Sequence, residues 1–179
     1  MQAAWLARDL RRPLTMFHRA ADFPFTRVLQ ANVDRIRAEA EAIRPLMVDW
    51  QETHLHDSCW QVYGLFGFPA GEALADGASR CPFTTDLIAR HVPTHGAAGF
   101  SLLKPHSRIH PHRGYAGSFL RCHLPLSVPQ GDCALRVEQE VRTWTPGECL
   151  VFDDRVEHEA WNLTSEPRIV LLLDFVPLA

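Results

Sequence analysis

The segment HPHRGYAGSFLRCH, residues 110–123, joins two strand-like pieces through a break that contains Gly114 and Gly117. His112 ends the first piece, and Arg121 and His123 lie in the second. Glycine readily turns the chain, so the two pieces are expected to be consecutive strands that carry histidine and arginine side chains. The fold around the segment decides whether those side chains form a site.

From residue 97 onward, short apolar runs alternate with turn signals rich in proline and glycine. The runs are AGFSLLK, SFLRCHLPL, CALRVEQEV, ECLVF, HEAWNL and RIVLLLDFV. Several short strands at this spacing are typical of an all-β sandwich or barrel. No helical segments intervene, which argues against a parallel sheet built from βαβ units.

The preceding residues contain helical patterns instead. Residues 32–44 place apolar side chains on one helical face, with Asn32 as the expected N-cap. Residues 83–91 predict another helix, capped by Thr84 or Thr85. This half of the chain is therefore expected to supply helices that cover the β core.

No linker, internal repeat or low-complexity tract divides the sequence. Residues 1–179 are therefore expected to form one domain, with a helix-rich part over 1–96 and a β core over 97–179. A short helix is also expected over residues 3–12. The simplest architecture is a mainly β jelly roll with the N-terminal helices packed on it.

The bulk composition excludes several classes of protein. The chain has 179 residues, 22% of them charged, and a formal net charge of −3, so nucleic acid is not an expected partner. No apolar run is long enough to span a membrane, and the N-terminal segment is too charged for a signal peptide. The five cysteines are odd in number and form no CxxC pair, which favours reduced thiols in a cytoplasmic protein without a membrane anchor.

Two strands carry charged side chains where apolar ones are expected. In SFLRCHLPL, alternation places Arg121 and His123 on one face, and Leu120, Cys122 and Leu124 on the face that suits a core between two sheets. The arginine and histidine face either solvent or a cavity, where together they suit an anion. Arg168 opens the apolar run RIVLLLDFV and is either a surface cap or the charged end of a pocket.

A second histidine lies in VFDDRVEHEAWN, residues 151–162. His158 is either a solvated turn residue or a partner of His112, which is 46 residues earlier in a strand that can be its neighbour in a jelly roll. Two neutral imidazoles that converge suit Fe(II), Zn(II) or Cu(II). With Arg168 facing the same interior, the arrangement is typical of an oxygenase that consumes 2-oxoglutarate.

The motifs FSLLKPHSRIHPHRG, RCHLPL, W-x-P-G-E and FDDRVEHEAWN-x5-R closely resemble the aspartyl/asparaginyl β-hydroxylase family. The resemblance covers residues 97–176 well and the preceding segments weakly. The family comprises Fe(II)/2-oxoglutarate-dependent dioxygenases on a double-stranded β-helix, so the resemblance implies a cupin-like jelly roll that hydroxylates an unactivated C–H bond with O2. The implied substrate is a small-molecule, amino-acid-like or peptide substrate, attacked at the β-carbon of an aspartyl, asparaginyl or related group.

The resemblance assigns the metal site to three residues. His112 and His158 resemble the two iron ligands, and Asp154 resembles an acid that hydrogen-bonds metal-bound water. Many jelly-roll iron enzymes hold the metal with a histidine followed two residues later by Asp or Glu. Gly114 occupies that place here, which matches the family's lack of a carboxylate ligand.

The resemblance also assigns the co-substrate site. Ser101 and Arg168 resemble the pair that binds the distal carboxylate of 2-oxoglutarate, and Arg121 and His123 the pair near its metal-chelating end. His106 and His110 receive no role. Strand alternation does not decide whether His110 or His112 faces the metal.

One departure from the family bears on the substrate. Animal members have Arg-x-Arg-x-His where this chain has Phe119, Arg121 and His123, and the missing arginine is the one near an acidic substrate side chain. This departure therefore argues against an acidic protein residue as the substrate. Residues of the N-terminal half form either a substrate wall or a buried aromatic layer: Trp50, His54, His56, Trp60 and Tyr63.

Three alternatives stay open from the sequence. A hydroxylase of a non-amino-acid substrate, such as an acyl chain, fits the same motifs, although no hydrophobic anchor for a membrane-bound lipid enzyme is visible. A vacant metal position can also admit chloride and halogenate. A non-catalytic cupin-like module would bind a metal or a 2-oxo acid without consuming it.

Overall fold

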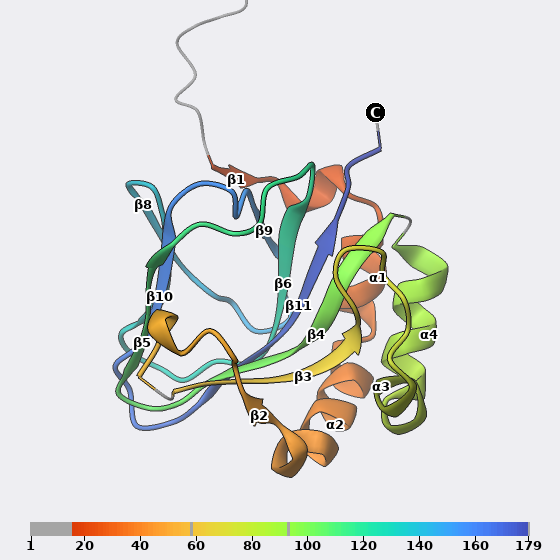
Figure 1. Ribbon diagram of the computed structural model, residues 1–179, viewed down its shortest axis with the longest axis horizontal. Helices are drawn as coiled ribbons and strands as arrows, with labels where there is room; N and C mark the ends of the chain where they lie inside the picture. The colour runs from red at the N-terminus through yellow and green to blue at the C-terminus, as the bar shows by residue number, and fades with distance from the viewer. Residues whose placement is uncertain (1–15, 58, 93, 179) are drawn as a thin grey trace, which may run out of the picture.

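The computed structural model describes residues 16–57, 59–92 and 94–178. Two antiparallel sheets face each other, and the α-helices gather on the outer side of the larger sheet (Figure 1). This arrangement confirms the predicted double-stranded β-helix, a cupin-like jelly roll with N-terminal helices packed on it. The helix predicted over residues 3–12 lies outside the described residues.

The larger sheet has the strand order β1-β9-β6-β11-β4-β3-β2. Its strands are β1 (Phe17–His18), β2 (Val48–Asp49), β3 (Trp60–Phe66), β4 (His95–Leu103), β6 (Leu120–Ser127), β9 (Leu150–Phe152) and β11 (Arg168–Phe175). The smaller sheet has the order β5-β10-β7-β8. Its strands are β5 (Ser107–His112), β7 (Cys133–Val137), β8 (Glu140–Thr143) and β10 (His158–Asn162).

The helices all precede β4 in the chain. They are α1 (Phe25–Ala31), α2 (Val33–Ile43), α3 (Ala75–Arg80) and α4 (Pro82–His91), with short 3-10 turns at Ala20–Asp22, Arg44–Leu46 and Thr53–Leu55. Helices α2 and α4 confirm the two predicted amphipathic segments. Strands β1, β2 and β3 were not predicted. Strand β1 pairs with the distant β9, whereas β2 is only two residues long and pairs with the nearby β3.

Two predicted helix caps are wrong. The Asn32 side chain makes no capping bond and instead donates to a carbonyl of α1. Helix α4 begins at Pro82, before both predicted threonine caps. The carboxylate of Glu39 on α2 accepts hydrogen bonds from the backbone N–H groups of Phe83 and Thr84, so the cap comes from a neighbouring helix.

The larger sheet is covered on both faces, which corrects the predicted position of Leu120, Cys122 and Leu124. These side chains join the core between the sheet and the helices, and not the core between the two sheets. Alternation gives the two faces of a strand but does not tell which cover lies over each face. The opposite face, with Arg121 and His123, therefore points toward the smaller sheet.

Strand β11 has the same division and is buried on both sides, as its continuous apolar run predicted. Ile169 and Leu171 pack toward the helices, whereas Val170 packs between the sheets. Arg168 shares the alternation of Val170 and is 1% exposed. The reading of Arg168 as a surface cap is therefore wrong.

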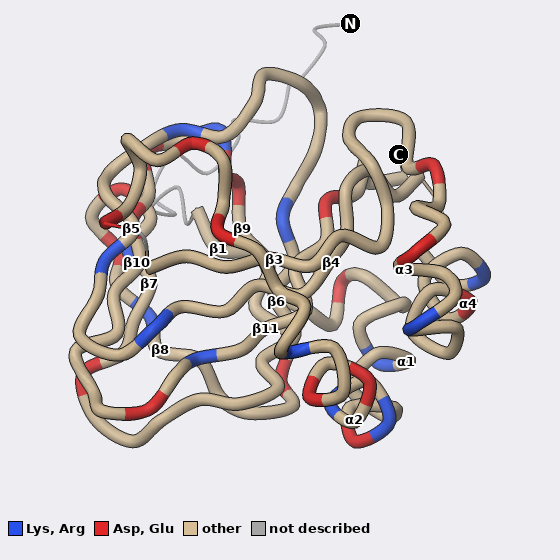
Figure 2. Tube along the Cα trace, turned by 60° about the horizontal axis from the view of Figure 1, so that its bottom comes forward, with Lys and Arg blue, Asp and Glu red and all other residues tan. Residues whose placement is uncertain are grey.

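The described helices include none that is long and apolar enough to cross a membrane. Acidic and basic positions are mixed along the chain, and no element carries a long stretch of one sign (Figure 2). This distribution agrees with the absence of a basic footprint in the sequence.

Candidate active site

His112 and His158 lie opposite each other at the ends of β5 and β10. They are registered partners in the smaller sheet, and their ring centroids are 4.2 Å apart. Nδ1 of His112 is 2.7 Å from the His110 carbonyl oxygen, and Nδ1 of His158 is 2.9 Å from that of Val156. A carbonyl oxygen only accepts, so each Nδ1 carries the proton and each Nε2 keeps a lone pair available to a metal.

A β-bulge turns His112 toward the interior. His158 pairs with His112, but Ala160, two residues later, pairs with Ile109, three residues earlier, so β5 contains one extra residue. Ile109 packs between the sheets, and regular alternation from it would direct His112 outward. Pro111 has no N–H to donate and is tolerated there because β5 is an edge strand.

Burial keeps both imidazoles neutral. Loss of hydration and, to a smaller extent, the neighbouring His112 lower the pKa of His158 from 6.5 to about 3. Burial also lowers the pKa of His112, although its hydrogen bond to the His110 carbonyl opposes this effect. Neutral imidazole is the form that binds a metal ion.

Asp154 occupies the space left by the missing side chain of Gly114. A Cβ atom built on Gly114 would lie 2.2 Å from Asp154 Oδ2, and the N–H of Gly114 donates to the Asp154 carbonyl at 2.7 Å. Burial raises the pKa of Asp154, and the nearby Arg121 charge opposes the rise. Among the described residues, no three His, Cys, Asp or Glu side chains are grouped closely enough to hold a metal, so Asp154 does not form such a group with the two histidines.

Arg121 is fixed by two carboxylates. Its Nε and Nη2 donate to Asp174 at 2.8 and 3.0 Å, and Nη2 also lies 3.0 Å from Asp154 Oδ2. Burial alone would lower the pKa of Arg121, but the ion pair with Asp174 outweighs it and raises that pKa. Asp174 was missed from the sequence, although a single carboxylate in the buried run LLLDFV is itself a signal.

Arg168 and His123 present N–H groups that have no acceptor. Arg168 Nε and Nη1 and His123 Nε2 are buried without a hydrogen-bond partner. Trp144 Nε1 donates to His123 Nδ1 at 3.2 Å, so the His123 proton is on Nε2, and the Arg168 guanidinium lies 4.8 Å from the Trp144 ring centroid. Burial lowers the pKa of Arg168 to about 10. An unpaired buried guanidinium is costly, so this region suits an anionic ligand.

Ser101 lies on the same inward face of the sheet. It pairs with Val170 on β11, and its Oγ accepts a hydrogen bond from Trp60 Nε1 at 3.0 Å. Because the tryptophan can only donate, the serine hydroxyl proton stays available to an acceptor. The structure thus directs Ser101, Arg121, His123 and Arg168 inward from the larger sheet, opposite the histidine pair.

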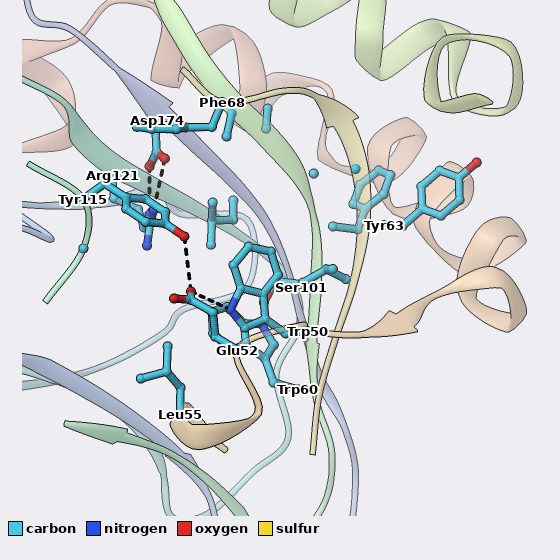
Figure 3. Close-up of a pocket in the computed structure, with 18 of the residues that line it drawn as sticks. Trp50, Glu52, Leu55, Trp60, Tyr63, Phe68, Ser101, Tyr115, Arg121 and Asp174 are labelled. Carbon is cyan, nitrogen blue, oxygen red and sulfur yellow. Dashed lines mark hydrogen bonds and ion pairs between the residues drawn. The ribbon is translucent and has the colours of Figure 1, made fainter. Parts of the chain in front are cut away.

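A cavity of about 310 Å³ opens beside His112, which lines it. Its lining also includes Ser101 and Arg121, together with aromatic rings such as those of Trp50, Trp60 and Tyr115 (Figure 3). Of the N-terminal residues considered as a substrate wall, four line it: Trp50, His54, Trp60 and Tyr63. His56 instead braces the loop, because Nδ1 accepts from the Cys59 N–H and Nε2 lies 3.0 Å from the Trp50 carbonyl.

The remaining conspicuous residues lie at the rim or outside. Phe119 packs against Phe68, with ring centroids 5.7 Å apart, and its ring lies over Gly96. His110 contributes its carbonyl to His112, while its own ring is 3.6 Å from the Asp57 carboxylate. The exposed His106 has a left-handed backbone, with φ of 53°, at a turn.

Comparisons with known proteins identify the family to which the chain is similar. Residues 30–177 match the family model described as aspartyl/asparaginyl beta-hydroxylase. The chain is 35% identical over 167 residues to an ornithine lipid ester-linked acyl 2-hydroxylase of Rhizobium tropici, which covers 87% of this chain and 58% of that protein. It is 29% identical over 154 residues to human aspartyl/asparaginyl beta-hydroxylase, which covers 82% of this chain and 20% of the human protein.

A solved structure supports the fold alone. The prolyl-4-hydroxylase of Pseudomonas putida superposes with a TM-score of 0.51 at 18% identity, covering 82% of this chain and 88% of that chain. The chain spans less than two thirds of the length of the two curated relatives. On the family match and the sequence identities, the chain belongs to the aspartyl/asparaginyl β-hydroxylase family.

Proposed function

We propose that this chain is an Fe(II)/2-oxoglutarate-dependent dioxygenase that hydroxylates an unactivated C–H bond. The observation that carries the proposal is the buried, unpaired guanidinium of Arg168 inside the same barrel as two histidines with free Nε2 lone pairs. Iron fits the imidazole pair, and a dicarboxylate fits the buried donors. Membership of a hydroxylase family supports the same activity.

His112 and His158 would hold the iron, and their carbonyl-bound Nδ1 atoms orient both rings before it binds. When bound, iron and 2-oxoglutarate supply the oxidising chemistry that activates O2. Asp154, held by Arg121, would accept a hydrogen bond from a water beside the two histidines.

The contacts to 2-oxoglutarate would come from the inward face of the larger sheet. Arg168 and Ser101 would bind the distal carboxylate of 2-oxoglutarate, and His123 Nε2 would donate to an oxygen nearer the metal. Arg121 Nε and Nη2 are engaged by carboxylates, so a ligand would meet Nη1, which has no hydrogen bond among the described residues. Burial of these groups excludes water from the reacting centre.

Two substrate classes remain within this proposal. The first is the β-carbon of an aspartyl, asparaginyl or related amino-acid-like group, in line with the family. The second is an acyl chain, which the aromatic cavity and the apolar Phe119 favour and which the name of the Rhizobium tropici relative illustrates.

We also infer that the β core and the N-terminal part form one oxygenase domain, since β1, β2 and β3 belong to the same sheet as β4 and β11. All five cysteines are buried free thiols, which supports the proposal of a reducing compartment such as the cytoplasm.

Succinate release tests the activity. The chain is incubated with Fe(II), ascorbate, O2 and 2-oxoglutarate, with aspartate-containing peptides, free amino acids or acyl lipids offered in parallel. We expect succinate with at least one substrate class, loss of that turnover in His112→Ala and His158→Ala, and normal turnover in His110→Ala, whose carbonyl is retained. Binding of 2-oxoglutarate without Fe(II)-dependent succinate from any substrate would contradict the proposal and favour a non-catalytic module, whereas a product heavier by chlorine would indicate halogenation.

A further inference from the structure

The buried cation that lines the cavity is already engaged. Arg121 is shared by Asp174 and Asp154, so this buried group carries one more negative charge than positive. Arg113 is exposed, and its Nη1 donates to the Arg155 carbonyl at 3.4 Å. A substrate carboxylate that enters the cavity would therefore meet a buried arginine whose charge is already balanced, and among the described lining residues only the solvent-exposed Arg113 is an arginine without a carboxylate partner.

Glu52 is in the opposite situation. Its Oε2 accepts hydrogen bonds from Trp50 Nε1 at 3.2 Å and from Tyr115 Oη at 3.3 Å. Both donors are neutral, and among the described residues Glu52 has no ion-pair partner, while Oε1 has no hydrogen bond. Figure 3 shows this carboxylate between the Tyr115 and Trp50 rings, on the wall of the cavity.

Aromatic rings surround the position that a ligand of Glu52 would take. Trp50 and Trp60 have ring centroids 5.1 Å apart, and Phe68 and Tyr115 have centroids 5.0 Å apart. Aromatic faces attract an organic cation, and a half-buried carboxylate attracts it more strongly. The same rings provide apolar contact for a hydrocarbon attached to the cation.

We propose that Glu52 is a specificity-determining residue that binds an ammonium group carried by an apolar substrate. The inference rests on the proposed function only in taking this cavity as the substrate cavity. It refines the two substrate classes, because it requires a positively charged group on the molecule that is hydroxylated and disfavours a substrate with a lone carboxylate at this place.

Calorimetric titration with three probes of equal length tests the proposal: octylammonium, octanol and octanoate, each below its aggregation concentration. We expect octylammonium to bind about tenfold more tightly than octanol, as a charge-assisted hydrogen bond gives, and octanoate to bind most weakly. In Glu52→Gln the ammonium preference should disappear while octanol affinity stays within about twofold. Asp57→Asn, a change of an exposed carboxylate on the same segment, should preserve the preference.

Two outcomes would overturn the inference: equal affinity for octylammonium and octanol, or an ammonium preference that survives in Glu52→Gln. If Glu52→Gln does not fold, raising the salt concentration on the wild-type chain is the second measurement, because only octylammonium binding should weaken. Selective ammonium binding without succinate release from any substrate would contradict the proposed function but support the ammonium subsite at Glu52. Succinate release from a substrate that carries no cation, with unselective probe binding, would support the proposed function but contradict the ammonium subsite.

Discussion

The interior around Arg168 and the outer cavity around Glu52 make opposite electrostatic demands. Among the described residues, the interior presents three buried N–H groups without acceptors, whereas the cavity presents the Glu52 carboxylate without an ion-pair partner. His112 belongs to both regions, because it is a member of the histidine pair and also lines the cavity. On the two proposals above, one barrel would bind two ligands of opposite charge on the two sides of the histidine pair.

The two regions are also built differently. Arg168, His123 and Ser101 come from neighbouring strands, whose register fixes where each side chain points. Glu52 and Tyr115 come from segments between strands. Side chains on connecting segments vary more easily than those on paired strands, so the cavity is where a change of substrate is expected to occur within this family.

Replacing Arg168 by Met removes the buried guanidinium of the interior and should have the largest effect. Loss of the buried charged donors should weaken binding of 2-oxoglutarate by about 2–5 kcal/mol, roughly 30-fold to several thousand-fold, while metal binding changes little. The same variant should be more stable than the wild type without ligand, by about 1–3 kcal/mol, because an unpaired buried charge is replaced by an apolar side chain.

The measurements are the apparent KM for 2-oxoglutarate and the free energy of unfolding of the metal-free protein. Arg108→Met is the matched control, since Arg108 also lies over an indole, that of Trp161, but is exposed. An unchanged KM for 2-oxoglutarate in Arg168→Met would contradict the proposal that Arg168 binds this anion.

Gly114→Ala tests the boundary between the two regions. The new Cβ would lie 2.2 Å from Asp154 Oδ2, so the carboxylate or the loop must move. We expect turnover and iron affinity to fall by about 10- to 100-fold, the usual effect of disturbing a residue that orients a metal site. Gly67→Ala is the control, because its added Cβ would have no neighbour nearer than 3.8 Å. Full activity in Gly114→Ala would show that the position of Asp154 is unimportant.

Asp174→Asn removes one of the two carboxylates that pair with Arg121. Loss of one charged partner should lower the free energy of unfolding by about 1–3 kcal/mol and reduce iron affinity by about tenfold, since Arg121 no longer holds Asp154 firmly. Chemical denaturation and metal titration measure the two effects. In the control Asp86→Asn, which removes the exposed partner of Arg90, neither quantity should change beyond error.

The last effect is a dependence of stability on pH, which is small near neutral pH and grows as the pH falls. The folded-state pKa of His158 is lowered from 6.5 to about 3, so the unfolded chain binds a proton that the folded chain excludes. This contribution is fully present above pH 6.5 and is lost as the pH falls toward 3, by up to about 1.4 kcal/mol per pH unit. Thermal melts of the metal-free protein should therefore decline more steeply below pH 6.5 in the wild type than in His158→Gln. Parallel curves would contradict a neutral buried His158.

The sequence predicted most of the β core, because apolar runs and turn residues mark strands locally. Strand β5 ends at His112 and β10 begins at His158, as the segment boundaries indicated. The run CALRVEQEV was read as one strand, but it contains β7, a turn and the first two residues of β8, which pairs with β7 in a hairpin. Its turn uses Glu138 with φ of 51°, a conformation that normally requires glycine or asparagine, so no turn signal was present.

The features that escaped prediction depend on contacts between distant segments. Glu39 caps a helix that begins more than 40 residues later. Asp174 on β11 pairs with Arg121 on the adjacent strand β6, which is also distant in the sequence. Neither partner could be identified without the fold. The roles of the seven predicted site residues stay predictions, although all but Asp154 come from strands whose inward faces meet, and Asp154 joins them from the segment before β10.

The extra residue in β5 means that a count of residues, and not their kinds, decides which way the imidazole of His112 faces. At the present spacing of three residues from Ile109, loss of the bulge would turn His112 outward, because strict alternation would place Pro111 inward. Deletion of Pro111 would instead bring His112 two residues after Ile109 and keep it inward without a bulge. Among relatives, an odd spacing between the inward isoleucine and the histidine therefore requires a bulge for the histidine pair to be retained, whereas an even spacing does not.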